Sequence, residues 1–468
     1  MTTTARTLQA VGVLIICLIL YVAWFLAGRP VITTDYIAEL NNLVRPSADD
    51  SLNAAPLYQK AIDTLVDVND VKELLRLDFH DANDQRKELI RQWLAKNQTS
   101  LDLVAKGSQL PYFWQPYQSK APEQSVMSVL LPNLTFCRAI CYALCWQSWL
   151  NAEDGNINAA LSDIEALYRF GRHNKSGKIL IEQLVGIAIE GRAMGTTRWL
   201  LDTYKIDPGT LAEFQRRLQH LIDNDTFGLD IQSEKLFMFD EIQRCFTESR
   251  FGPAHVYPRR LVEISYIAIS MDGIPSEVNQ LGDLDWALAS VLPLKNFPCI
   301  FTHPNKAESI ASANALYKFW DENITKTPAQ LHAEQIDLDA ESRRLIKNNI
   351  VLKVLTPGLE RLHMVAWRNK VDAEGTLVTI ALVRYKQDTG NYPETLDKLV
   401  ETKYIRQVPI DPFSDKPVIY RKTADGCILY SVGANLTDDG GQVARDENGK
   451  IEWGSEQGDW VFWPVEKD

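Results

Sequence analysis

The stretch ALVRYKQDTGNYP at Ala381–Pro393 is followed by VPIDP at Val408–Pro412 and by LYSVGAN at Leu429–Asn435. The positions before Ala381 are apolar at intervals of three and four residues, which predicts one face of a helix. Gly390 and Pro393 predict where that helix ends, because glycine favours a left-handed C-cap and proline cannot continue a helix. The C-terminal part of the chain should therefore begin with a long helix that stops at a defined point.

Outward from these strings, the pattern predicts a second, short helix and a β-hairpin with an Ala-Asp-Gly turn. One helix laid across a small sheet buries the apolar faces of both. We therefore expect residues 351–468 to form a small helix-on-antiparallel-sheet module. Its elements are helices over Leu359–Tyr385 and Thr395–Val400 and strands over Val418–Lys422 and Cys427–Val432.

In order and approximate spacing, these strings resemble the globular domain of the major (G-type) pseudopilin of type II secretion. The resemblance implies a calcium ion bound in the loop after the last strand, by backbone carbonyls and aspartates. Asn435 stands where the family usually has Asp, and the neighbouring acidic pair could restore the missing charge. By position, the ligands would come from the carbonyl of Val432 and the side chains of Asn435, Asp438, Asp439 and Asp459.

The resemblance leaves two questions open. An acidic, glycine-rich loop suits calcium, which takes six to eight oxygen ligands, but an ion-free Asx-rich turn accounts for the same residues. The chain also lacks the prepilin cleavage site and the early glutamate of true pseudopilins, having GVLII from Gly12. Assembly into a pseudopilus is therefore not expected, and fold alone does not establish function.

Near the N-terminus, Ala10–Gly28 contains no charged residue. A helix over this segment reaches roughly 28 Å, close to the thickness of the bilayer hydrocarbon. We expect an uncleaved membrane anchor in residues 1–30, with a cleavable signal peptide as the alternative. Lys and Arg are almost balanced around it, so charge does not decide the orientation. The weak calcium affinity typical of extracellular modules favours an extracytoplasmic location for the bulk of the chain.

Residues 31–350 read as a mostly helical domain, so the expected fold class is α+β and predominantly α. Helices are expected from Pro132 past Trp149, over Ile157–Phe170, over Ile179–Leu201 and over Leu211–Ile222. The segment Phe251–Pro304 contains six prolines and should be irregular.

Composition narrows the function classes. The formal charge of −12 argues against nucleic-acid binding, which needs a clustered basic surface.

The seven cysteines form no disulfide framework, and Cys137, Cys141 and Cys145 are spaced for packing along one helix. The string GRHNKSGK at Gly171–Lys178 departs from the phosphate-binding loop in spacing and in its missing Ser or Thr.

No ordinary catalytic motif is present, and Glu182 and Glu190, near Arg192 and Arg198, are interpreted as a charged helix face.

The main hypothesis is a non-catalytic, single-pass protein of the bacterial inner membrane, bound to the bilayer through residues 10–28. Its helical domain would bind other envelope proteins. One alternative is an accessory component of a type II secretion or pilus-like system, with secretion-system proteins as partners. The other is a membrane-tethered hydrolase with an unrecognised site.

Overall fold

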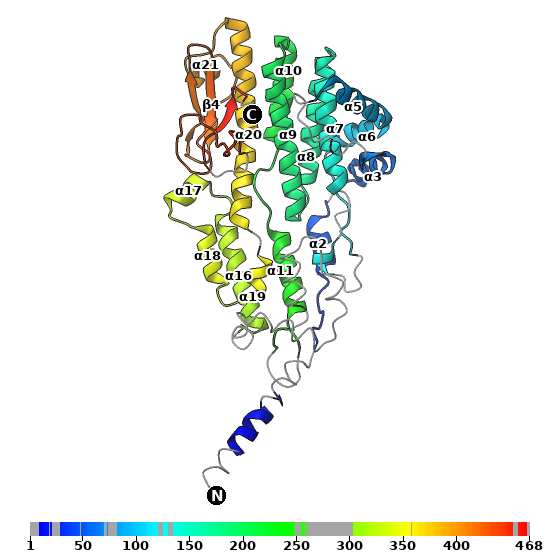
Figure 1. Ribbon diagram of the computed structural model, residues 1–468, viewed down its shortest axis with the longest axis vertical. Coiled ribbons are helices and arrows are strands. Elements are labelled where there is room, and N and C mark those ends of the chain that lie inside the picture. Colours follow the sequence, from blue (N-terminus) through cyan, green and yellow to red (C-terminus); the bar gives the residue numbers. More distant parts are fainter. Residues whose placement is uncertain are drawn as a thin grey trace.

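The computed structural model describes residues 9–17, 19–20, 29–46, 48–69, 73, 82–119, 125–129, 134–248, 254–257, 260, 303–356, 358–452 and 457–465. The protein is predominantly helical and carries a small antiparallel sheet near its C-terminus, which confirms the expected class. The body is elongated (Figure 1), with helical residues of the N-terminal segment at one end and the sheet toward the other. The irregular segment expected over Phe251–Pro304 falls almost entirely outside the described residues.

The first half of the chain forms consecutive helices close to the expected bounds. Each of the four helices expected between Pro132 and Ile222 is present and extends a few residues further. The helices are α2 (Tyr36–Val44), α3 (Ala55–Thr64), α5 (Asp84–Lys96), α6 (Gln98–Ser108), α7 (Leu134–Glu153), α8 (Ile157–Lys175), α9 (Leu180–Thr203), α10 (Pro208–Asp223) and α11 (Gln232–Cys245), with short 3-10 turns η1 (Asp50–Leu52) and η2 (Val126–Ser128).

The second half continues with short helices and then one long one. The helix expected over Leu359–Tyr385 is present, and it ends four residues later, at Thr389, with the left-handed Gly390 as its C-cap. The short helix after it is also present. These elements are α16 (Lys306–Asn323), α17 (Pro328–Ala333), α18 (Leu338–Leu345), α19 (Ile350–Leu355), α20 (Leu359–Thr389) and α21 (Leu396–Glu401).

The expected β-hairpin is confirmed, with Ile419 opposite Tyr430 and Lys422 opposite Cys427. A third strand, which the sequence analysis did not predict, pairs with the far side of the hairpin. Arg368 of α20 stacks over Trp460 of this strand, 4.5 Å from the ring centre, so the helix and the sheet are in contact. The strands are β1 (Ile410–Asp411), β2 (Lys416–Pro417), β3 (Ile419–Lys422), β4 (Cys427–Ser431) and β5 (Trp460–Trp463).

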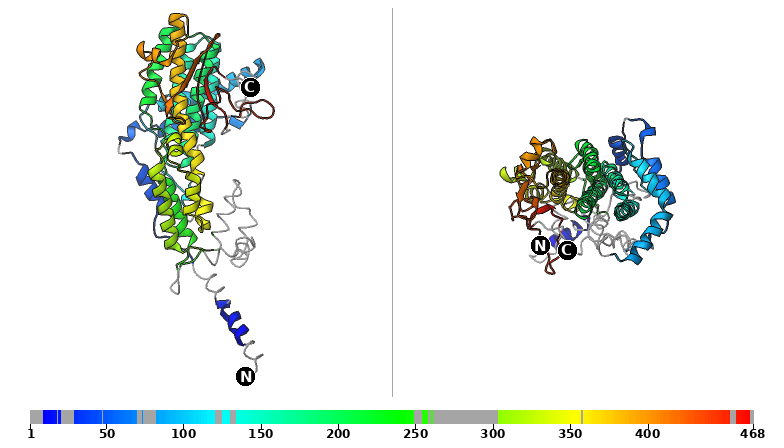
Figure 2. Two further views of the ribbon diagram at one scale, coloured as in Figure 1. Left: turned by 90° about the vertical axis from the view of Figure 1, so that its left-hand side faces the viewer. Right: turned by 90° about the horizontal axis from the view of Figure 1, so that it is seen from above.

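Two large hydrophobic cores lie one above the other in the described part of the molecule, and a small third cluster surrounds Leu40 of α2. The first joins α3, α5–α10, the C-terminal part of α20 and the sheet, and the second joins α11, α16, α18 and α19. Both α9 and α20 contribute to each core: Leu180 and Leu359 lie in the second, Ala193 and Leu377 in the first. Figure 1 shows both helices running lengthwise through the body, and α20, in yellow to orange, keeps this course in the turned view of Figure 2. Residues from both sides of the boundary expected at 350 thus share each core.

The N-terminal helical residues 9–17 and 19–20 contribute to neither core. Their large apolar side chains are exposed, namely Val11, Val13, Leu14, Ile15, Ile16, Ile19 and Leu20. Within the described part of the chain, no helix is long and apolar enough to cross a membrane. Much of the expected span over residues 10–28, namely residues 18 and 21–28, lies outside the described residues, so the transmembrane helix stays a prediction.

Candidate functional site

The C-terminal acidic loop folds around the carboxylate of Asp459, which is buried at the start of β5. One oxygen of Asp459 accepts the backbone N–H of Asp439 at 3.2 Å, and the other accepts that of Gly441 at 2.6 Å. The side-chain amide of Asn435 donates to Oδ2 of Asp439 at 2.8 Å. The structure therefore brings together three of the five expected ligand residues, although their contacts are hydrogen bonds within the loop.

The other two expected ligands make different contacts. Asp438 forms an ion pair with Arg421 at 2.9 Å and accepts the hydroxyl of Tyr430 at 2.8 Å. The backbone N–H of Val432 donates to Asp411 at 3.0 Å. Asp438 is thus bound to residues of the hairpin. Val432 is bound to the Pro-Asp-Pro turn around Asp411, which comes before the hairpin in the chain.

Hydrogen bonds within the loop engage the carboxylate of Asp459, which the resemblance assigns to calcium. Each oxygen of Asp459 accepts one N–H group, and a carboxylate oxygen has two lone pairs. Among the residues that the structure describes, no three His, Cys, Asp or Glu side chains are gathered as a metal site. Calcium binding stays a prediction.

Asp411, which the sequence analysis treated only as a turn residue, joins the Pro-Asp-Pro turn to the end of β4. Its side chain is fully buried. It accepts the N–H of Phe413 at 3.0 Å, the hydroxyl of Ser431 at 2.8 Å and the N–H of Val432 at 3.0 Å. A buried carboxylate is stable only when donors surround it, so Asp411 has a structural role at the base of the loop.

A second polar cluster lies inside the helical bundle. Nζ of Lys175, at the end of α8, is 2.8 Å from Oε2 of Glu190 on α9 and 2.8 Å from Oδ2 of Asp225 after α10. Tyr168 donates to the same oxygen of Asp225 at 2.8 Å, and Asn369 of α20 donates to Oε2 of Glu190 at 2.6 Å. The side chains of the three charged residues are at most 6% exposed.

The two carboxylates of this cluster differ in how well they are satisfied. Oε1 of Glu190 is buried and has no hydrogen-bond partner among the residues that the structure describes. Burial raises the pKa of Glu190 to about 7, although the nearby Lys175 acts in the opposite direction. The expectation that Glu190 belongs to an exposed charged face is therefore wrong, because the residue is 0% exposed.

The close approach of α8 and α9 accounts for this burial. Gly186 of α9 lies against the backbone of Lys175, and an added Cβ would come within 2.2 Å of the Lys175 nitrogen. The string around Gly171, considered above as a phosphate loop, is instead the end of α8 where Lys175 turns inward. The sequence alone did not show which charged residues lie between these two helices.

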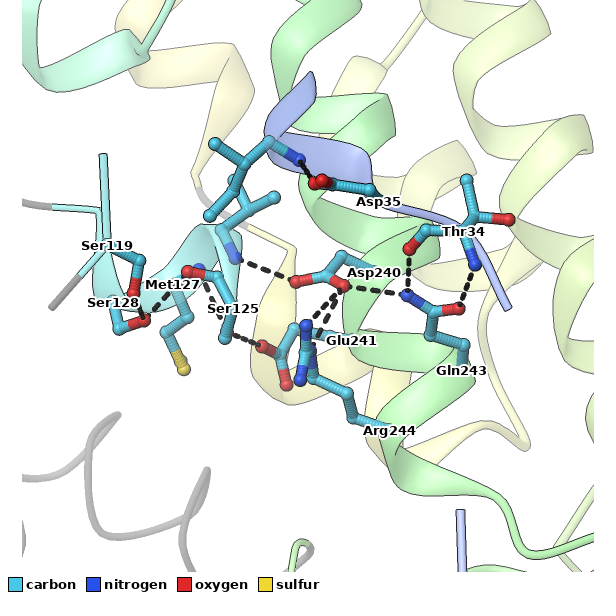
Figure 3. A network of polar contacts seen from close by, with 12 residues as sticks. Thr34, Asp35, Ser119, Ser125, Met127, Ser128, Asp240, Glu241, Gln243 and Arg244 are labelled. Carbon is cyan, nitrogen blue, oxygen red and sulfur yellow. Dashed lines mark hydrogen bonds and ion pairs between the residues drawn. The ribbon is translucent and has the colours of Figure 1, made fainter. Parts of the chain in front are cut away.

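A network of hydrogen bonds near the C-terminal end of α11 holds the segment that follows the N-terminal helix. Figure 3 shows Gln243 of α11 held between Thr34 and Asp240. Oε1 of Gln243 accepts the N–H groups of Thr33 and Thr34 at 3.2 and 3.3 Å, and its amide donates to the carbonyl of Thr34 at 2.9 Å. Asp240 also accepts the N–H of Val126 at 2.7 Å. The chain after the exposed apolar helix is therefore fastened to the body.

A surface hollow of about 430 Å³ lies between α18, α19 and the start of α20. Trp320, Ile346 and Leu359 form its apolar floor, and Lys347 and Lys353 line it. Both lysines are exposed. Its size would admit a small organic anion, but these surface lysines by themselves do not define a binding site.

Comparison with models of known protein families, with curated proteins and with solved structures found no match. The class is therefore defined by the fold itself. It is a mainly helical α+β protein with an acidic loop at its sheet, a buried charged cluster in its bundle and an exposed apolar helix at one end.

Proposed function

We propose that this protein is a non-catalytic scaffold of the bacterial envelope, tethered to the inner membrane by its N-terminal apolar segment. The bulk of the chain would stand outside the cytoplasm, where its helical part would bind envelope partners beside the helix-on-sheet module. The observation that carries the proposal is the exposure of seven large apolar side chains between Val11 and Leu20. Such a helix is stable when lipid covers it, because contiguous exposed apolar surface is costly in water.

The layout of the molecule supports this role. The apolar helix projects from one end of the elongated body, and the sheet lies toward the opposite end (Figure 1). Gln243 fastens residues 33 and 34 to α11, so the body would hold a defined position relative to its tether. The module would then be presented at a distance from the bilayer.

Membrane association of the full-length chain tests the proposal. Leu14→Lys combined with Ile16→Lys should release the protein from membranes, because a charge in the hydrocarbon costs several kcal/mol, roughly 2.5–3.5 each. The measurement is flotation with membranes after a carbonate wash. Leu89→Lys, at another exposed apolar position, is the matched control and should float like the wild type. A wild-type chain that stays with the soluble proteins would contradict the proposal.

Orientation is tested separately with a cysteine in place of the exposed Ser51, in a chain where Cys17 and Cys299 are replaced by Ser. The other five cysteines are buried. A membrane-impermeant maleimide should label this cysteine in spheroplasts without lysis. Labelling only after lysis would place the body in the cytoplasm.

An accessory role in a type II secretion or pilus-like system is the second candidate, and the helix lying on a small antiparallel sheet favours it. Crosslinking in cells that captures pseudopilins would support that role. Capture of unrelated envelope proteins instead would favour the general scaffold.

A further inference from the structure

The buried cluster of α8, α9 and α20 holds one ammonium group and two carboxylates. When all three are ionised, the cluster carries one net negative charge in a part of the core where its side chains are at most 6% exposed. Burying an uncompensated charge costs several kcal/mol, which proteins commonly avoid by taking up a proton.

The hydrogen bonds show where such a proton fits. Oε2 of Glu190 accepts from Lys175 and Asn369, and Oδ2 of Asp225 accepts from Lys175 and Tyr168. Oε1 of Glu190 is buried and accepts no hydrogen bond from any part of the chain that the structure describes. A proton on Oε1 would neutralise the carboxylate without breaking any of these bonds.

Other charged groups around Glu190 do not replace this proton. Arg172 of α8 points to the carbonyl of Leu221 at 3.3 Å, and Arg198 of α9 pairs with Asp372 of α20 at 2.8 Å. His173 of α8 contacts Tyr58 and the carbonyl of Leu110. The groups that face Glu190 are Tyr168 and Lys175 of α8, Asp225 after α10 and Asn369 of α20.

We propose that this cluster is a proton-operated latch, in which protonated Glu190 holds α9 against α8 and α20 and loss of the proton loosens that contact. Glu190 occupies the point where the three helices meet, and α9 and α20 also run into the second core. Loosening would therefore reach both ends of the body. This inference does not depend on membrane attachment or on calcium.

The direction of the pH dependence follows from linkage. The ordinary pKa of a glutamate is 4.5, and burial raises that of Glu190 to about 7 in the folded protein. Between these values the folded chain keeps a proton that the unfolded chain has lost, so this stabilisation falls as pH rises. It is complete below pH 4.5 and is lost as pH passes 7.

Thermal unfolding of the full chain at pH 6 and pH 8 tests the latch, with Glu190→Gln as the variant. Gln is neutral at every pH and imitates the protonated side chain. The wild type should lose more Tm between these pH values than the variant, by roughly 1–2 °C, because a large unfolding entropy makes the Tm of a long chain respond weakly to a change of about 1.4 kcal/mol. Glu165→Gln is the control, since Glu165 is also buried but is paired with Arg217 at 2.6 Å, and it should keep the wild-type slope.

Parallel loss of Tm in the wild type and in Glu190→Gln would overturn the proposal. If the variant does not fold, infrared spectroscopy of the wild type decides the question. The carbonyl stretch of a buried, protonated carboxyl group should be present at pH 6 and should disappear toward pH 8. A spectrum with no such band at pH 6 would equally overturn it.

Discussion

At the scale of single residues, the distance between α8 and α9 is set by glycines, and the buried charges depend on that distance. A Cβ at Gly186 would meet the backbone of α8, at 2.2 Å from the Lys175 nitrogen and 2.6 Å from the Gly171 oxygen. Backbone atoms cannot swing aside as a flexible side chain can. The helices would have to separate, and the short bonds of Lys175 would lengthen.

We therefore expect Gly186→Ala to lower the free energy of unfolding by about 1–3 kcal/mol, as overpacking usually does. The measurement is denaturant unfolding of the full chain. Gly191→Ala, on the same helix with no atom near its added Cβ, is the matched control. It should be neutral or stabilising by about 0.5–1 kcal/mol, because alanine favours helix over glycine. Equal effects of the two substitutions would contradict this packing argument.

At the scale of elements, the acidic loop is held by one buried carboxylate between β4 and β5. Asp459 organises it through two backbone N–H groups, and Asp411 secures its base. This is the arrangement from which a calcium ion would have to recruit oxygen ligands. The loop can therefore be stable without the ion, and binding would add to that stability.

If the resemblance to the pseudopilin module extends to its ion, calcium should raise the Tm of the full chain relative to chelator. With a dissociation constant of 10⁻⁴–10⁻³ M, calcium at 10 mM would stabilise the folded state by about 1–3 kcal/mol. Magnesium is the control ion, since it prefers a smaller, octahedral site. Asp439→Asn should remove the calcium effect. Identical Tm values with calcium and with chelator would leave the ion-free turn as the correct interpretation.

At the scale of the whole molecule, two long helices connect two cores. With 31 residues, α20 spans roughly 46 Å, and it packs in the second core near Leu359 and in the first near Leu377. The residues after Leu359 thus complete the first core, although they follow the second core in the chain. Cooperativity should extend over most of the body.

A chain that ends at residue 350 should accordingly lose its cooperative thermal transition, because the faces of α9 and α10 that pack on α20 become exposed. The measurement is circular dichroism during heating, together with gel filtration. Removal of residues 1–28 is the control and should preserve the transition, since the helical residues there contribute to neither core. A cooperative transition in the chain ending at 350 would instead indicate that residues 31–350 fold as an independent domain.

The sequence by itself determined the elements whose causes are local. Periodic apolar residues and Gly390 predicted helices to within a few residues, and the hairpin followed from its turn. Apolar spacing and turn chemistry act over a few neighbouring residues, so they can be read without coordinates.

Only the tertiary structure decided which distant residues meet. It added β5 to the sheet, paired Asp438 with Arg421, and placed Glu190 in the core beside Lys175 and Asn369. A charged residue on a helix has the same local pattern whether water or another helix covers it. The environment of such a residue depends on packing between segments up to 179 positions apart. The pattern of neighbouring residues does not predict that packing.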